Sequence, residues 1–121
     1  MSGTYSRDKG ARWEVAIARY LRDHGYQAVT SRDLRGGTQG GSDIITTFPT
    51  TIEAKNHAKL DLAGWVDQAV EDAAGDWASV WVKRRGKSYV GESYVVMRVT
   101  DFVGLVGELA VRPLDDTEVP F

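Results

Sequence analysis

Three charged residues stand among apolar ones in the stretch GGSDIITTFPTTIEAKNHAKL, which spans residues 40–60. Asp43 precedes two isoleucines, and Glu53 and Lys55 flank a single alanine in the next apolar segment. A buried charge is costly unless it has a partner, binds a metal or takes part in a reaction. These three residues are therefore the first candidates for chemistry.

Two short strands, residues 43–47 and 51–55, are predicted on either side of Phe48-Pro49. An antiparallel hairpin with Asp43 opposite Glu53 would place the two carboxylates about 5 Å apart on one face. Lys55 returns to that face because side chains alternate along a strand, whereas the neighbouring apolar residues point into the core. The pairing thus predicts that two acids and one amine converge.

Two carboxylates at this distance repel each other unless a cation or a proton lies between them. Lys55 could neutralise them in a structural ion cluster, or they could act as an acid and base pair, as in glycoside hydrolysis. They could also bind a hard divalent cation, for which oxygen ligands without nearby cysteine favour Mg²⁺ or Mn²⁺. The third alternative explains the lysine best, because an amine beside a metal-bound water can position it and stabilise the charge that develops.

A fourth acidic residue, Glu14, lies in a helix predicted over residues 7–24 from the recurrence of apolar residues at helical spacing. Glu14 shares one stripe of this helix with Ala11, Ala18 and Leu21. It could therefore face the sheet and complete the metal shell, or hold a second ion. The alternative is an acid on the helix surface near the positive N-terminus.

The pattern along the whole chain predicts one helix, three strands, a second helix, two strands and a last helix. This order favours an α/β (α+β) fold, with a mixed central sheet flanked by helices. A single domain is expected over residues 7–111, with a flexible tail at 1–6 and an acidic tail at 112–121. The predicted helices are 7–24, 60–74, capped by Asp61, and 100–109, capped by Thr100 or Asp101; the strands are 26–31, 43–47, 51–55, 77–84 and 93–100.

The composition excludes several classes of protein. The 121 residues suit one domain with one core. Cysteine is absent, which excludes disulfides, thiol nucleophiles and Cys-based zinc sites. No apolar run is long enough to cross a bilayer, and the polar N-terminus lacks the apolar centre of a secretion signal. We therefore expect a cytoplasmic protein without a membrane partner.

Charge is unevenly distributed along the chain. The net charge is −2, but the last nine residues contain three acids and no base, and without these three the 17 acidic residues fall to 14, against 15 basic ones. A basic surface for nucleic acid is compatible with this distribution, the alternative being an ordinary solvated surface. The candidate DNA-binding residues are the clustered bases Arg7, Lys9, Arg12, Arg32, Arg35, Lys83, Arg84, Arg85 and Lys87.

Asp43 in SDII and Glu53-Ala54-Lys55 in TIEAK resemble the motif of the PD-(D/E)XK nuclease superfamily, whose core is αβββαβ and restriction-endonuclease-like. Glu14 in GARWEVAIARYL matches the glutamate that the first helix of the family often carries, and Gln68 in WVDQAVEDA matches a polar residue of its second helix. The chain looks most like the archaeal-type Holliday junction resolvases, which share its small size, a glycine before the helix glutamate (here Gly10) and a Gly-rich loop before the aspartate.

The resemblance implies a Mg²⁺-dependent endonuclease, a phosphodiester hydrolase of DNA recombination and repair, in which Mn²⁺ is expected to substitute. It implies a branched DNA substrate and a homodimer that cuts two strands symmetrically, with Trp65 and Trp77 as candidates for the subunit interface. The catalytic residues implied are Glu14, Asp43, Glu53, Lys55 and Gln68, and the metal ligands are Asp43, Glu53, the carbonyl of Ala54, and Glu14.

Other functions remain open from the sequence. A restriction-like, repair, phage or toxin nuclease acting on DNA or tRNA would use the same motif, and a phage enzyme would act in the host cytoplasm. A non-catalytic nucleic-acid-binding module, or an interaction domain with a structural ion cluster, are the alternatives outside enzymes. Ser42 stands where many of the resembling nucleases have proline or glycine before the aspartate.

Overall fold

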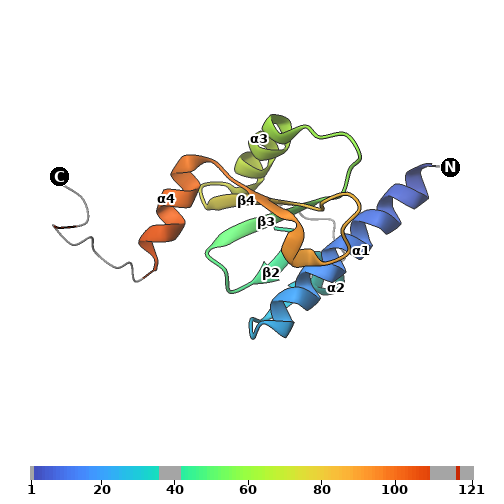
Figure 1. Cartoon of the computed structure of the whole chain (residues 1–121), viewed down its shortest axis with the longest axis horizontal. Helices are drawn as coiled ribbons and strands as arrows, with labels where there is room; N and C mark the ends of the chain where they lie inside the picture. The colour runs from blue at the N-terminus through green and yellow to red at the C-terminus, as the bar shows by residue number, and fades with distance from the viewer. Residues whose placement is uncertain (1, 36–41, 110–116, 118–121) are drawn as a thin grey trace.

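The computed structural model describes residues 2–35, 42–109 and 117 (Figure 1). Its helices are α1 (Ser2–Asp23), α2 (Ser31–Arg35), α3 (Leu62–Ala73) and α4 (Val99–Gly107), with one 3-10 turn, η1 (Val90–Glu92). Its strands are β1 (Ala28–Thr30), β2 (Ile44–Thr46), β3 (Thr50–Lys55), β4 (Trp77–Val82) and β5 (Tyr94–Val96). The predicted order of helices and strands is therefore confirmed, with α2 as an addition.

The described strands form two sheets. β1 and β2 pair antiparallel, with Val29 opposite Ile45. β3 and β4 pair in parallel, with Glu53 opposite Val80, and β5 is antiparallel to β4. This mixed three-stranded sheet with helices around it confirms the predicted α/β (α+β) class, whereas the nuclease core implied by the resemblance stays a prediction.

The hairpin predicted between residues 43–47 and 51–55 is wrong in its pairing. β2 pairs with β1 instead, and the chain passes between the two sheets at Asp43. The N–H of Asp43 donates to the Ile52 carbonyl at 2.7 Å, while its carbonyl accepts the Ser31 N–H at 2.8 Å. The Ser42 hydroxyl accepts the N–H of Ile52 at 2.8 Å and so replaces the next bond of a regular ladder. Asp43 is thus held beside β3 by both sheets.

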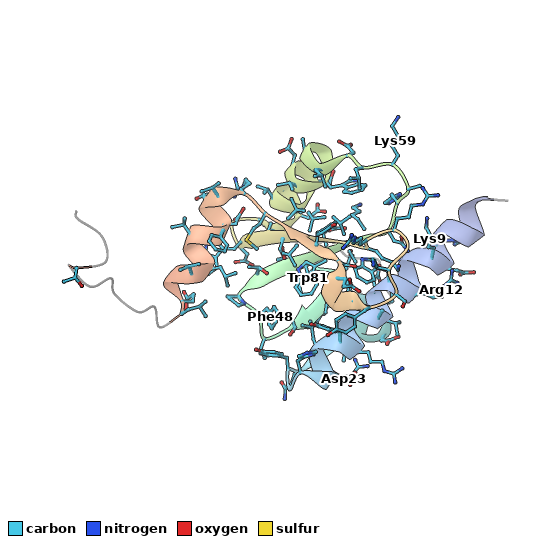
Figure 2. The ribbon with its side chains drawn as sticks, viewed as in Figure 1. Lys9, Arg12, Asp23, Phe48, Lys59 and Trp81 are labelled. Atoms are coloured by element: carbon cyan, nitrogen blue, oxygen red, sulfur yellow. The ribbon has the colours of Figure 1, made fainter. Side chains whose placement is uncertain are left out.

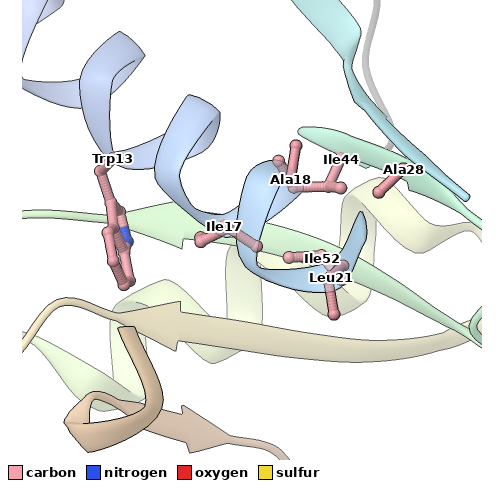
Figure 3. Packing of buried hydrophobic residues seen from close by; sticks show 7 residues of the cluster. All are labelled: Trp13, Ile17, Ala18, Leu21, Ala28, Ile44 and Ile52. Atoms are coloured by element: carbon pink, nitrogen blue, oxygen red, sulfur yellow. The ribbon is translucent and has the colours of Figure 1, made fainter. Parts of the chain in front are cut away.

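α1 covers one face of the strands with an apolar stripe. Trp13, Ile17 and Leu21 recur at helical spacing and are at most 3% exposed. Figure 3 shows these side chains pointing from α1 toward the strands that carry Ile44 and Ile52. The Trp13 Nε1–H also donates to a carbonyl of β4 at 3.0 Å, which fixes the position of the helix on the sheet.

α3 packs on the other face of the three-stranded sheet. Its small side chains contact Val80 and Val82 of β4. Because Glu53 is paired with Val80 and Lys55 with Val82, strand alternation places both charged residues on the α3 side and Ile52 on the α1 side. The predicted separation of charged from apolar residues along β3 is therefore confirmed.

Both ends of α3 follow the sequence, whereas α1 begins earlier than predicted. The Asp61 carboxylate accepts the N–H of Gly64 at 3.2 Å, so Asp61 is the N-cap of α3 as predicted. α3 ends at Ala74, whose φ angle is 51°, followed by Gly75, whose φ angle of 100° is one that glycine adopts without strain. α1 begins at Ser2, so residues 2–6 are helical where the sequence predicts a flexible tail.

The start of α4 also differs from the prediction. Arg98 occupies the N-cap, not Thr100 or Asp101. The Asp101 carboxylate, three residues further on, accepts the Arg98 Nε–H at 2.7 Å and the N–H of Ala78 in β4. The predicted acidic tail, residues 112–121, lies outside the described residues apart from residue 117. Within the described ranges, none of the helices has the length and apolar character needed to span a bilayer.

Candidate active site

A cavity of about 250 Å³ lies where α1, α2 and the carboxyl end of β3 meet. Its wall includes Glu14 from α1, Asp43 ahead of β2, and Glu53, Ala54 and Lys55 from β3. The structure therefore brings together the predicted acids and amine, whereas their roles in catalysis stay predictions. The other lining residues are Lys9, Gly10, Arg32, Asn56 and His57.

Asp43 is aimed at the open edge of β3 by backbone contacts. Its Oδ2 accepts the Ala54 N–H at 2.8 Å, which adds to the bond between its own N–H and Ile52. Ser42 secures this arrangement, because its hydroxyl bridges the backbones of Ile44 and Ile52. A proline or glycine at position 42 has no hydroxyl, so this chain uses a different means of placing the aspartate from the one the resemblance suggests.

Glu53 has the most strongly altered titration in the cavity. Burial, the charge of Asp43 and a hydrogen bond to Asp43 together raise the pKa of Glu53 to about 8, while Lys55 opposes the rise. Asp72 of α3 also contributes to the raised value. Two carboxylates therefore lie so close that, without a cation, the pair retains a proton near neutral pH.

Glu14 is buried in the same cavity but is already paired. It is 6% exposed, and the Arg32 Nε–H donates to its Oε1 at 2.8 Å. Burial raises the pKa of Glu14 above its ordinary value, the hydrogen bond from Arg32 lowers it, and Asp43 raises it. Arg32, a candidate DNA-binding residue, lines the cavity and pairs with Glu14 while its side chain stays 46% exposed, so its contact with DNA stays a prediction. The short helix α2 places it there, since the Asp33 N–H bonds to Thr30 Oγ1 at 3.1 Å.

The oxygen ligands of the cavity suit a hard divalent cation. Asp43 and Glu53 supply carboxylates, and the Ala54 carbonyl leaves β3 on the same edge as its N–H, which bonds to Asp43. Among the described residues, no three His, Cys, Asp or Glu side chains form a ready ligand set. Mg²⁺ commonly uses one or two carboxylates together with water and substrate phosphates, so this ligand set fits Mg²⁺ or Mn²⁺.

Gln68 is not brought to the cavity. It lies on the exposed face of α3 and donates to Asp72 Oδ1 at 3.0 Å. Asp72 is the α3 residue that affects Glu53, because its charge raises the Glu53 pKa. The prediction of Gln68 as a catalytic residue therefore finds no direct contact in the structure, and any influence of Gln68 would pass through Asp72.

Two lining residues were missed or interpreted differently from the sequence. Asn56 and His57 follow Lys55 directly and continue the cavity wall. Burial lowers the pKa of His57, as do the charges of Lys55 and Lys9. The spacing of His57, two residues beyond the motif lysine at the end of β3, is the signal that could have identified it.

The candidate DNA-binding residues gather only in part. A second cavity, of about 220 Å³, is lined by Lys9 and Arg12 of α1 and by Lys83. It shares Lys9 and Asn56 with the first cavity. Figure 2 shows Lys9 and Arg12 on α1. Arg7, Arg84 and Arg85 are exposed, and the side chain of Arg35 lies outside what the structure describes. Lys83 Nζ donates to the Lys87 carbonyl at 2.7 Å, and Lys87 Nζ lies 3.9 Å from Glu92 Oε2.

The two tryptophans suggested for a subunit interface are half-buried within the chain. Trp65 packs against the core between α3 and β4. Trp77 packs against Gly104 of α4, where a Cβ atom would collide with the indole ring. These contacts account for both residues without a partner, so they do not support the expected homodimer, which stays a prediction.

No match is found when the chain is compared with protein-family models, with curated proteins or with solved structures. The resemblance to PD-(D/E)XK nucleases therefore stays a hypothesis based on the motif residues. Function has to be argued from the cavity itself, since a fold alone does not define an activity.

Proposed function

We propose that this protein is a metal-dependent endodeoxyribonuclease that hydrolyses phosphodiester bonds at the cavity bounded by Glu14, Asp43, Glu53 and Lys55. The observation that carries the proposal is the Asp43–Glu53 pair, two carboxylates close enough for one to raise the pKa of the other, with an amine beside them. Such a pair is unfavourable for the fold alone, and a divalent cation would turn the repulsion into coordination.

The residues of the cavity have distinct proposed roles. Asp43, Glu53 and the Ala54 carbonyl would hold the ion, and Glu14 would reach it through water. A bound Mg²⁺ supplies a Lewis acid for the phosphate and lowers the pKa of a water molecule. Lys55 lies near Glu53, and the charge of Lys55 lowers the Glu53 pKa. At this position the amine would orient the attacking water and stabilise negative charge on the phosphate.

The proposed substrate is DNA, and the resemblance to archaeal-type Holliday junction resolvases favours branched DNA such as a four-way junction. Lys9, Arg12 and Lys83 support a nucleic-acid partner, because their cavity adjoins the acidic one and phosphates are natural ligands for clustered cations. A resolvase cuts two strands related by a two-fold axis, so a homodimer is part of the proposal.

The test is a cleavage panel of labelled four-way junction, duplex, flap, single-stranded DNA and tRNA, each with Mg²⁺, with Mn²⁺ and with EDTA. We expect cleavage of the junction with either metal and none in EDTA. Lys55→Ala should lower the cleavage rate by about 10²–10³-fold and leave the Kd for junction DNA within about twofold, because the amine acts on the developing charge.

Lys59→Ala is the matched control. Lys59 is an exposed lysine four residues along the same segment, it does not line the cavity, and Figure 2 shows it pointing away from the body of the molecule. This variant should cleave as the wild type does. Wild-type rates in both Lys55→Ala and Asp43→Asn would contradict the proposed active site, and cleavage of tRNA or flap DNA alone would replace the junction as substrate.

A further inference from the structure

A third cavity differs in character from the acidic one. It has a volume of about 380 Å³ and is formed by the connection between β3 and α3, the end of β4, and β5. We call it the apolar groove, because Leu60, Leu62, Val82, Tyr94 and Val96 line it. Leu60 is 59% exposed and Tyr94 53% exposed, so much of this apolar surface faces solvent. Exposed apolar surface gathered in one hollow commonly marks a binding site.

One part of the groove wall is basic. Lys83, Arg84 and Arg85 contribute to its wall, and none of its lining residues is acidic. The guanidinium of Arg84 lies 5.8 Å from the centroid of the Tyr94 ring, an arrangement typical of a cation–π contact. The charge of the groove therefore complements a ligand that has an apolar face and carries negative charge.

The apolar groove continues directly from the acidic cavity. His57 lies in the wall of both, and Lys55 is paired across the sheet with Val82 of the groove. At most about 7 Å of extended chain separates the Cα atoms of Lys55 and His57. A ligand of nucleotide size can therefore present a phosphate to Lys55 while its other end enters the groove.

We infer that the apolar groove binds one unpaired nucleobase of the nucleic acid whose backbone enters the acidic cavity. A base has two apolar faces that stack on aromatic and apolar side chains, and the phosphates on either side of it supply the negative charge that Lys83, Arg84 and Arg85 would meet. A base inside a duplex cannot reach such a groove without leaving its stack. The inference rests on the proposed cleavage at the acidic cavity, and it favours strands with an unpaired base beside the phosphate that is cut over a fully paired four-way junction.

The test measures binding by fluorescence anisotropy in EDTA, so that it does not depend on hydrolysis. Labelled single-stranded DNA should bind more tightly than the duplex of the same sequence, and a matching RNA strand shows whether the sugar matters. Tyr94→Ala should weaken single-strand binding about five- to 150-fold, the range found when a stacking side chain is removed. Tyr94→Phe should retain binding, since it keeps the ring.

Tyr26→Ala is the matched control, because Tyr26 is 47% exposed and lies outside the groove. Leu60→Ser tests the groove a second time at a residue outside any strand, and it should weaken binding in the same direction. An abasic nucleotide moved along the strand should reduce wild-type affinity at one position and have no further effect in Tyr94→Ala. Such non-additivity would identify the base that Tyr94 contacts.

The inference is overturned if Tyr94→Ala, Leu60→Ser and the abasic strands all bind as the wild type and the intact strand do. It is also overturned if sedimentation shows that Tyr94→Ala changes the oligomeric state while strand binding is unchanged, because the groove is then a contact between subunits. If the protein cleaves DNA with Mg²⁺ and neither binding nor cleavage depends on Tyr94, the proposed nuclease activity stands and the groove inference is wrong. If strand binding depends on Tyr94 but no substrate is cleaved, the groove inference stands and the proposed nuclease activity is wrong.

Discussion

Asp101 of α4 and Glu53 of β3 are both carboxylates beside β4, but their surroundings shift their pKa values in opposite directions. Asp101 is 1% exposed and accepts hydrogen bonds from Arg98 and from the backbone of Ala78. The Arg98 hydrogen bond lowers the pKa of Asp101 below its ordinary value. Burial and the neighbouring Asp43 raise the pKa of Glu53 to about 8.

The comparison distinguishes a carboxylate whose charge is balanced within the fold, Asp101, from one whose charge could be balanced by a bound cation, Glu53. The chain itself supplies the cation and the N–H for Asp101, so nothing further is needed there. Around Glu53 the positive charge of Lys55 only partly offsets the effects of Asp43 and of burial on the pKa. Perturbed pKa values are common at functional sites, and the direction of the shift here indicates which of the two carboxylates could use an external cation.

The largest effect on stability is expected from Asp101→Ala. The variant should lose about 2 kcal/mol of unfolding free energy in urea, because the buried N–H of Ala78 and the guanidinium of Arg98 lose their acceptor. Since the folded pKa of Asp101 is lowered, its contribution is present above the ordinary Asp pKa of about 4 and is lost as the pH falls through the lowered value.

Asp23→Ala, at the exposed end of α1, is the control and should change stability by less than about 0.5 kcal/mol. If Asp101→Ala were no less stable than this control, Asp101 would not be the structural acid of the comparison.

A smaller effect of opposite sign is expected from Glu53→Gln. With EDTA present, the folded wild type retains a proton between pH 4.5 and about 8 that the unfolded chain has released, so its stability falls as the pH rises through this window. The amide of the variant stays neutral at every pH, so Glu53→Gln should become more stable than the wild type by on the order of 1 kcal/mol at pH 8, allowing for solvent screening. Thermal unfolding across this pH range is the measurement.

Glu71→Gln, at an exposed position of α3, should give no such pH-dependent difference. Added Mn²⁺ at pH 8 should stabilise the wild type and not Glu53→Gln, because ligand binding to the folded state raises its stability. Parallel curves for Glu53→Gln and the wild type would mean that Asp43 and Glu53 do not repel each other.

The sequence was sufficient for features set by local rules. Alternation along one strand placed Glu53 and Lys55 on the same face. Helical spacing left two positions open for Glu14, facing the sheet or on the helix surface, and the structure buries it. The order of helices and strands followed from apolar periodicity in the same way. The convergence of Asp43 with them was also correct, although the hairpin that predicted it was not.

The features that the sequence did not predict depend on partners distant along the chain. β2 pairs with β1, and the Ser42 hydroxyl accepts the Ile52 N–H that a hairpin would have used. The pairing of Glu14 with Arg32 requires the short helix α2, whose five residues carry too weak a pattern to predict. Gln68 was assigned from its position in a helix. Asp72 lies one turn further along the same face of α3, and its charge is the one that raises the Glu53 pKa, so position along the helix axis separates the two residues.

The smallest effect on stability is expected from Arg32→Gln. This variant tests whether Glu14 resembles Asp101, a carboxylate paired within the fold, or Glu53, a carboxylate that could bind an external cation. Removing Arg32 leaves the buried Glu14 without its ion pair, and in EDTA this should cost about 1 kcal/mol or less, because Arg32 is 46% exposed. If the cavity binds a divalent cation, Mn²⁺ should raise the Tm of the variant more than that of the wild type, since Glu14 then becomes a third carboxylate for the ion. The control is Arg19→Gln, at an exposed position of α1, the helix that carries Glu14; it should show the same Tm shift with Mn²⁺ as the wild type. A Tm shift no larger in Arg32→Gln would place Glu14 with Asp101, as an acid whose charge serves the fold.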